Sequence, residues 1–127
     1  MILPEIISKE PLGPAVRQND SKWFDVVSYA HYAMITAEDF GITQANLDEM
    51  TKSENPDIKR FLGEEKDQTI GKDLGLDEKW AYNIVKQVGN YGEVFERNVG
   101  QASPLKIERG LNVLWSKGGL QYAPPIR

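Results

Sequence analysis

One glycine-punctuated stretch holds the residues that come nearest to a catalytic arrangement. Glu93 and Glu96 lie three residues apart, Arg97 follows directly, and Gly89 and Gly92 precede them. Two carboxylates can act as acid and base in glycoside cleavage, so a small hydrolase with Glu93 or Glu96 as its acid is a weak alternative. Residues three apart share a helix face, and we therefore expect an ion-paired surface with Arg97 instead. The glycines lack the Lys-Ser/Thr of a phosphate-binding loop, and a helix C-cap and a turn explain them better.

The single histidine, His31, and the absence of cysteine limit the remaining chemistry. A hydrolase triad needs a serine and an acid beside the histidine, and a metal site needs further nitrogen or sulfur donors. We interpret His31 as a helix-surface or half-buried residue. The charged run 64–67 lacks the alternating acids, glycine and final glutamate of a calcium loop, which leaves solvated loop charges. The sequence thus predicts no catalytic residue, no metal site and no cofactor.

Three tryptophans, Trp23, Trp80 and Trp115, occupy apolar positions of expected helices. Tryptophan can stack a ligand, but at helical spacing it more often packs in a core, and we predict all three as core residues. Trp23 begins the clearest apolar stripe, which continues at spacings of three and four as far as Ala37. This stripe needs a partner surface, because helix stability in water comes mainly from packing.

The chain is short and acidic. Its 127 residues suffice for one domain, and 15 basic against 19 acidic residues give a formal net charge of −4 at pH 7. This balance gives no general attraction to nucleic acid, so we expect no nucleic-acid partner. Hydrophobic residues make up 40% and charged residues 27%, which indicates a folded protein. No stretch approaches the roughly 20 apolar residues needed to span a bilayer, and residues 1–5 lack the features of a signal peptide.

The apolar periodicity predicts a mainly helical fold with one or two short strands, of the α+β class. Proline-rich residues 1–20 are expected to form brief extended pieces, with apolar pairs at 2–3 and 6–7 and a short strand over 15–17. The polar, glycine-rich stretch 64–75 is expected to be an exposed loop, and the tail 120–127 to be extended. Helices are expected over 21–40, 44–52, 55–62, 77–88, 91–98 and 103–117.

Capping residues mark several of these boundaries. The polar cluster 19–21 should begin the first helix, and Gly41 should end it. Asn55 is a typical N-cap, Pro56 suits the first helical position, and Asp57 places an acid in the first turn. These signals are local, so they fix where helices begin and end without saying how the helices pack.

Four stretches of the sequence resemble a known family. They are ILPEIISKEPLGP over 2–14, VGNYGEVFERNVG over 88–100, SPLKIERGLN over 103–112 and GGLQYAPPIR over 118–127. The chain resembles the C-terminal part of periplasmic general L-amino-acid-binding proteins of ABC transporters, which are extracellular solute-binding proteins of family 3. Members of this family have two lobes and are more than twice as long as this chain.

The resemblance implies a partial type II periplasmic-binding-protein fold. Residues 1–20 would be the crossover, and residues 21–127 the C-terminal part of lobe 1 with a helical extension, as a single domain. The groups that hold the amino acid in the cleft between the lobes are expected in the missing parts. Arg17 lies beside the crossover, yet a surface arginine explains it better, and no ligand-binding residue is assigned.

The implied function is that of a truncated or fragment form of the substrate-binding component, which is not an enzyme. The full-length parent would bind an L-amino acid in the periplasm and deliver it to an ABC permease. The alternative is a stand-alone helical domain for self-association or another interaction. Because the helices would lack the sheet that they cover, we expect exposed apolar faces and a homo-oligomer, with exchange of the N-terminal segment or first helix as one route.

Overall fold

Helix α1 (Ser21–Asp39) is the element around which the chain is arranged, in a computed structural model that describes residues 12–65 and 70–126. Asp20 precedes the helix, and its carboxylate accepts a hydrogen bond from the Trp23 amide at 3.1 Å. This bond satisfies one of the free amides of the first turn. Gly41 has φ of 68°, a left-handed conformation that glycine adopts without strain. The helix predicted over 21–40 and both of its capping signals are confirmed.

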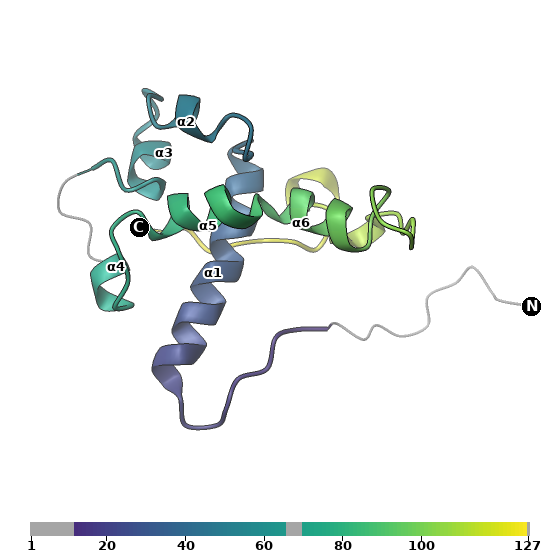
Figure 1. Ribbon diagram of the computed structural model, residues 1–127, viewed down its shortest axis with the longest axis horizontal. Helices are drawn as coiled ribbons and strands as arrows, with labels where there is room; N and C mark the ends of the chain where they lie inside the picture. Colours follow the sequence, from purple (N-terminus) through teal and green to yellow (C-terminus); the bar gives the residue numbers. More distant parts are fainter. Residues whose placement is uncertain (1–11, 66–69, 127) are drawn as a thin grey trace, which may run out of the picture.

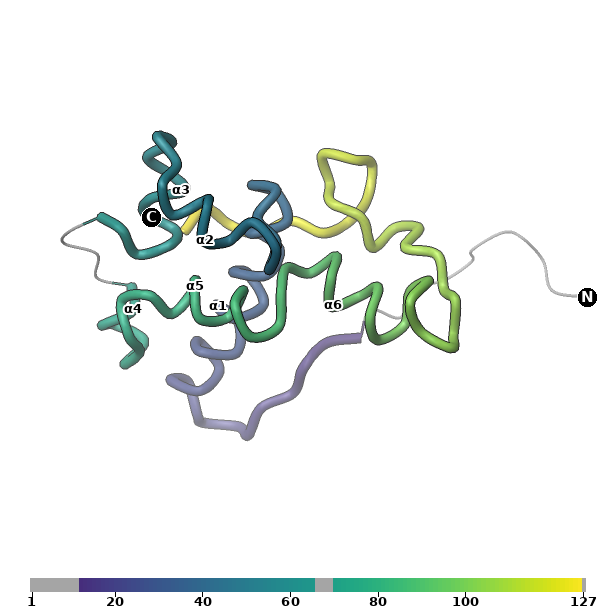
Figure 2. Tube along the Cα trace, turned by 45° about the horizontal axis from the view of Figure 1, so that its top comes forward, coloured from purple at the N-terminus to yellow at the C-terminus, as the bar shows by residue number. Residues whose placement is uncertain are grey.

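Helices α5 (Trp80–Val88) and α6 (Tyr91–Asn98) follow one another across α1, as Figures 1 and 2 show. Gly89 ends α5 with φ of 84°, as predicted. Asn90 and Glu93 then form a capping box, in which each side chain accepts from the other residue's amide at 2.9 Å. The buried Asn90 side chain also donates to the Ile42 carbonyl at 2.8 Å. The turn between α5 and α6 is therefore fastened to the chain just after α1.

Three short helices complete one side of the core. They are α2 (Leu47–Met50), α3 (Pro56–Phe61) and α4 (Ile70–Asp73). Helix α3 begins as predicted, because the Asn55 side chain accepts from the Asp57 amide at 2.9 Å and Pro56 takes the first position. Buried side chains of α2, α3, α5, the second half of α1 and the residues that follow α1 and α3 pack into one cluster: Ala33, Ala37, Ile42, Leu47, Ile58, Phe61, Leu62, Trp80, Ala81 and Val85.

Helix α4 lies within the stretch 64–75 that was expected to be a loop, so that prediction is wrong for these residues. The reason is a close approach to the start of α5. Gly71 is buried, and a Cβ added there would lie 2.7 Å from the Asp77 carbonyl oxygen and 3.1 Å from the Trp80 ring. Glycine thus serves here as a packing residue, whereas the sequence pattern favours glycine as a turn former.

The helix predicted over 103–117 does not form. The structure has turns and two short 3-10 helices instead, η1 (Gly110–Asn112) and η2 (Trp115–Lys117). Lys106 and Gly110 have positive φ values of 54° and 47°, which a continuous right-handed helix does not allow. The apolar spacing of this segment therefore reflects single contacts made by an irregular chain.

No strand is present among residues 12–65 and 70–126, so the class is helical there rather than α+β. The strand predicted over 15–17 is wrong, since these residues have no regular structure and pair with no other segment. The apolar pairs at 2–3 and 6–7 lie outside the described residues. An isolated bridge joins Leu114 and Gln121, but a strand needs neighbouring strands that these residues do not supply.

The C-terminal tail runs back across α1 toward the short helices in both views (Figures 1 and 2). The Trp115 amide donates to the Gln121 carbonyl at 2.9 Å, and the Gln121 amide donates to the Val113 carbonyl at 3.2 Å. Ile126 then packs against the core cluster. The tail is therefore anchored at both ends, and it forms one wall of a groove beside α1.

Candidate functional site

A nearly buried ion pair joins the end of α1 to the C-terminal segment. The guanidinium nitrogens of Arg109 bind the two carboxylate oxygens of Glu38 at 2.5 and 3.0 Å. The Glu38 side chain is only 9% exposed and that of Arg109 16%. Arg109 also donates to the Asn112 carbonyl at 2.7 Å. This bidentate geometry is the strongest form of a charged hydrogen bond, and it spans 71 residues of sequence.

Two rings of α6 cover the same guanidinium group. Its central carbon lies 5.4 Å from the centre of the Tyr91 ring and 5.7 Å from that of Phe95. Burial raises the pKa of Tyr91, while the positive charge of Arg109 acts in the opposite direction. A Cβ at Gly92 would lie 3.0 Å from an Arg109 nitrogen, so the absence of a side chain there leaves room for the ion pair. Gly92 is therefore a helix residue that faces this pair, and its interpretation as a turn residue is wrong.

The chemistry available to this ion pair is limited to holding the segments together. Both oxygens of Glu38 accept from Arg109, and two guanidinium nitrogens are occupied. Among the side chains of the described residues, only the Arg109 Nε is buried without a hydrogen-bond partner. A bound carboxylate would have to displace Glu38, so the geometry indicates a clamp rather than a binding site.

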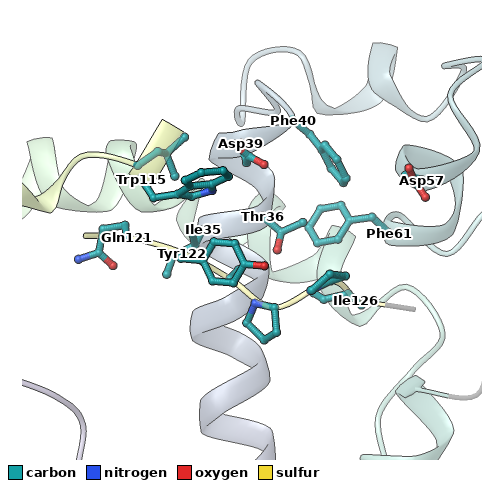
Figure 3. A pocket seen from close by; sticks show the side chains of 14 residues that line it. Ile35, Thr36, Asp39, Phe40, Asp57, Phe61, Trp115, Gln121, Tyr122 and Ile126 are labelled. Carbon is teal, nitrogen blue, oxygen red and sulfur yellow. The ribbon is translucent and has the colours of Figure 1, made fainter. Parts of the chain in front are cut away.

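A groove lies beside the second half of α1 (Figure 3). Its volume is about 260 Å³. One wall comes from α1 and α3 and carries Phe40 and Phe61, whose ring centres lie 5.8 Å apart. The other wall comes from η2 and the tail and carries Trp115 and Tyr122, also 5.8 Å apart. Edge-to-face contacts of this kind hold both pairs of rings in place.

The polar groups of the groove are uncharged or acidic, and they include Gln121 and Tyr122. Thr36 lies in its middle in Figure 3, and Asp39 and Asp57 lie at its rim. Asp57 is engaged by Arg60 at 3.4 Å. No lysine, arginine or histidine lines the groove within the described part of the chain. It has no basic group for the carboxylate of an amino acid, and it has no nucleophile beside a base.

The residues singled out in 89–97 have structural roles. The Glu93 carboxylate accepts from the Asn90 amide and from the Gln44 amide, the latter at 3.2 Å. Glu96 accepts from the Gln101 amide at 2.9 Å. Arg97 donates to the Val88 carbonyl at 2.9 Å, so the ion-paired surface expected here does not form. Because these carboxylates bind backbone amides, the geometry gives no support to a hydrolase.

His31 is half-buried in α1, as predicted. Its ring meets the edge of the Tyr91 ring with the centres 5.8 Å apart. Burial lowers the pKa of His31 below its ordinary value, because desolvation disfavours the charged form. No group of three potential metal ligands occurs in residues 12–65 and 70–126. None of the helices in these residues is long and apolar enough to span a bilayer.

The charged run 64–67 is described only for its first two residues. Glu64 pairs with Lys79 at 2.9 Å, and Glu65 pairs with Arg60 at 3.3 Å. The side chains of Glu64 and Glu65 are 30% and 36% exposed, so they are solvated charges as expected, and each also forms a surface ion pair. The other two residues of the run lie outside the described part of the chain. Arg17 is exposed at the start of the chain, and no contact assigns it a ligand.

The tryptophans divide into one core residue and two surface residues. Trp80 is 5% exposed and belongs to the core cluster. Trp23 is 53% exposed and Trp115 is 59% exposed, so the prediction that both are core residues is wrong. Trp115 lines the groove instead. Helical spacing indicates that a residue is available for burial, but the neighbouring segments decide whether it is buried.

The Glu38–Arg109 pair and the groove were missed by sequence reasoning. The two charged residues are 71 positions apart, and each lies in a segment rich in other charges. A long-range pair leaves no periodic signal within either segment. The available sign was Gly92 inside the helix expected over 91–98, since a glycine inside a helix indicates a close approach by another segment.

Known proteins resemble this chain over its whole length. It is 72% identical to the general L-amino acid-binding periplasmic protein AapJ of Rhizobium johnstonii, over 100% of this chain and 37% of that protein. It is 59% identical to the putative amino-acid ABC transporter-binding protein YhdW of Escherichia coli K12, with the same coverage. A solved ABC transporter periplasmic binding protein from Brucella ovis with glutathione bound matches at a TM-score of 0.93 and 65% identity.

The relatives of this chain are periplasmic amino-acid-binding proteins of ABC transporters. The resemblance drawn from the sequence is thereby confirmed. The Brucella match covers 98% of this chain and 39% of that protein, so the chain spans little more than a third of the relatives' length. No family model matches the sequence. The relatives are binding proteins of transport systems rather than enzymes.

Proposed function

We propose that this chain forms the corresponding segment of the substrate-binding component of an amino-acid ABC transporter. The observation that supports this proposal is agreement with the relatives in both sequence and fold. Identity to the Rhizobium protein is 72% over every residue, and the fold matches the Brucella protein at a TM-score of 0.93 over 98% of the chain. Such agreement extends beyond isolated motifs, so it supports a shared role in the whole protein. The role is non-covalent binding in the periplasm and delivery to a permease, without an enzymatic step.

Within this function, residues 21–127 belong to the C-terminal part of lobe 1 of a type II binding protein, and residues 1–20 form the crossover. The charges of the described residues favour a structural role for this segment over direct contact with the substrate. Its most buried carboxylate and guanidinium neutralise each other in the Glu38–Arg109 pair. The groove offers no basic group to a substrate carboxylate. The groups that hold the amino acid are therefore supplied by the remainder of the protein.

A chimera tests this function directly. This chain replaces the matched 37% of the Rhizobium protein, and L-amino-acid binding to the full-length chimera is measured by calorimetry. We expect saturable binding with an affinity within about tenfold of that of the unchanged Rhizobium protein. This limit corresponds to a change of about 1.4 kcal/mol in the binding free energy. A chimera that folds, shows the native melting transition and binds no amino acid would contradict the proposed function.

Self-association of the chain by itself is the second candidate. Large apolar side chains are exposed on its surface, among them Trp23 and Phe24 at 53% and 57%. Exposed apolar patches favour association, and exchange of the N-terminal segment would be one route to a dimer. The similarity to much longer binding proteins does not favour a stand-alone interaction domain. Sedimentation at micromolar concentration separates the two, because a monomer excludes the dimer.

A further inference from the structure

The groove beside α1 has aromatic rings on both of its walls. In Figure 3 the rings of Phe61 and Tyr122 reach toward each other from opposite walls, with Phe40 and Trp115 beside them. Trp115 and Tyr122 are 59% and 57% exposed, so their rings are open to a ligand. The face of an aromatic ring carries partial negative charge and attracts a cation within about 6 Å of the ring centre. The groove is therefore an apolar surface that also attracts positive charge.

The charged residues that line the groove are both acidic. Asp39 ends α1 and lies at the rim near Phe40, and Asp57 lies in the first turn of α3. Asp57 is paired with Arg60 at 3.4 Å, whereas the Asp39 side chain has no ion pair or hydrogen bond with a described residue. The C-terminal end of a helix also carries partial negative charge. The end of α1 and the exposed Asp39 carboxylate thus favour a positively charged ligand at the same place.

A hydroxyl group in the middle of the groove can orient such a ligand. Thr36 is half-buried there, and its hydroxyl makes no hydrogen bond with a described residue. It lies on the same helix as Asp39 and three residues before it, so the two side chains project toward one side of α1. An ammonium group has three N–H donors, and it can donate to the Asp39 carboxylate and to the Thr36 hydroxyl.

The charges of the groove disfavour a ligand that carries a carboxylate. No lysine, arginine or histidine lines the groove in the described part of the chain, so a ligand carboxylate would have no partner and would approach two acidic residues. An ammonium compound without a carboxylate meets only favourable charges. The volume of about 260 Å³ is close to the lower end of small-molecule pockets, which begin at about 300 Å³. The geometry thus favours a small amine over an amino acid.

We propose that this groove binds a small primary ammonium compound that has an apolar body and no carboxylate. Its ammonium group binds the Asp39 carboxylate and the Thr36 hydroxyl, and its apolar body packs against the rings of Tyr122, Trp115 and Phe61. This inference goes beyond the proposed function and does not depend on it, because an amino acid is the kind of ligand that the groove disfavours.

The experiment compares three probes that share one apolar body. Phenethylammonium, phenethyl alcohol and hydrocinnamate carry a positive, a neutral and a negative group on the same phenethyl scaffold. Each is titrated by calorimetry into the full-length chimera with the Rhizobium protein. We expect saturable binding of phenethylammonium with a dissociation constant of about 1 mM or lower. Phenethyl alcohol should bind at least about tenfold more weakly, because it lacks the charge that the carboxylate and the rings attract, and hydrocinnamate should not bind detectably.

Substitutions then locate the bound cation. Asp39→Asn and Tyr122→Leu should each weaken phenethylammonium binding about threefold or more, the first by removing the charge and the second by removing a ring. Asp73→Asn is the matched control, since Asp73 is an exposed aspartate of α4 outside the groove, and it should leave the affinity unchanged within error. Melting temperatures of the three variants establish that they fold alike.

Two results would overturn the inference. Equal affinities for phenethylammonium and phenethyl alcohol would show that the charge of the ligand is not recognised. Equal effects of Asp39→Asn and Asp73→Asn would show a general attraction of cations to an acidic protein, and the absence of phenethylammonium binding would exclude the site altogether. Amino-acid binding by the unsubstituted chimera is a separate measurement, so the proposed function can fail while the groove binds the amine.

Discussion

Arg109 shows how one side chain fixes a segment that has little regular structure. It joins Glu38 of α1, two rings of α6 and the Asn112 carbonyl. The segment around it contains only the three-residue helix η1 and turns. The Ile107 amide also donates to the Val99 carbonyl at 3.0 Å, so this charged group and single backbone hydrogen bonds together hold the segment in place. The ion pair matters here for where the chain lies, since a buried pair adds little net stability over an apolar replacement.

Removal of the Arg109 charge should destabilise the protein strongly. Arg109→Met leaves the Glu38 carboxylate nearly buried and unpaired, and we expect a loss of about 3–5 kcal/mol in the free energy of unfolding. Urea denaturation measures it. Lys79→Met removes the exposed partner of Glu64 and should leave the midpoint unchanged within error. Equal effects of the two substitutions would show that the buried pair has no special role. The double variant Glu38→Leu with Arg109→Met should recover part of the loss.

His31 should make stability depend on pH in a narrow window. Burial lowers its pKa in the folded state, so the unfolded state binds the proton more readily. The stabilising contribution of neutral His31 is fully present above its unfolded-state pKa of about 6.5, and it is lost as the pH falls through the lower pKa of the folded state. Melting temperatures between pH 7.5 and pH 5 should therefore decline less for His31→Gln than for the native chain. Because His31 is the only histidine, its NMR titration reports the lowered pKa without overlap.

At the scale of elements, capping chemistry decides where the helices begin and end. Asp20, Asn55 and Asn90 each accept a backbone hydrogen bond at the start of a helix. Gly41 and Gly89 end α1 and α5 with left-handed conformations. These features depend on residues within a few positions of one another, so the sequence predicts them well. Which side of each helix faces the core depends on segments far away in the sequence, as the exposure of Trp23 at the start of α1 shows.

Asn90 should contribute two separable terms to the stability of α6. Its oxygen caps the helix, and its nitrogen donates to the buried Ile42 carbonyl. Asn90→Ala removes both and should cost about 2–4 kcal/mol, the sum of a lost cap and an unsatisfied buried group. Asn90→Ser keeps a capping oxygen and should cost about 1–3 kcal/mol. Chemical denaturation of the two variants compares these losses. Equal losses would mean that the cap contributes nothing measurable.

At the scale of the whole molecule, the apolar surface is unevenly covered. The short helices, α5 and the tail cover α1 from Tyr29 onward, whereas Trp23 and Phe24 near its start are more than half exposed. Large exposed apolar residues also lie toward the C-terminus, including Leu105 and Leu120. The relatives are more than twice as long as this chain.

Tryptophan fluorescence should report this uneven coverage. Trp23 and Trp115 are more than half exposed, whereas Trp80 is 5% exposed. Three variants that each keep a single tryptophan, with phenylalanine at the other two positions, are quenched with acrylamide. We expect strong quenching for Trp23 and Trp115 and at least about fivefold weaker quenching for Trp80, because a quencher must reach the ring. Comparable quenching of all three would show that the core around Trp80 is open in solution.

The sequence by itself determined the helical character, the positions of the caps, the half-buried state of His31 and the resemblance to amino-acid-binding proteins. These features depend on residues close together in the sequence or on continuous motifs that the relatives share. Tertiary structure alone decided that 103–117 is irregular, that Gly71 lets α4 pack on α5, and that Glu38 meets Arg109. Each of these results from contact between segments far apart in the sequence. Residues 15–17 illustrate the limit, because a strand requires a neighbour, and no local pattern states whether that neighbour is present.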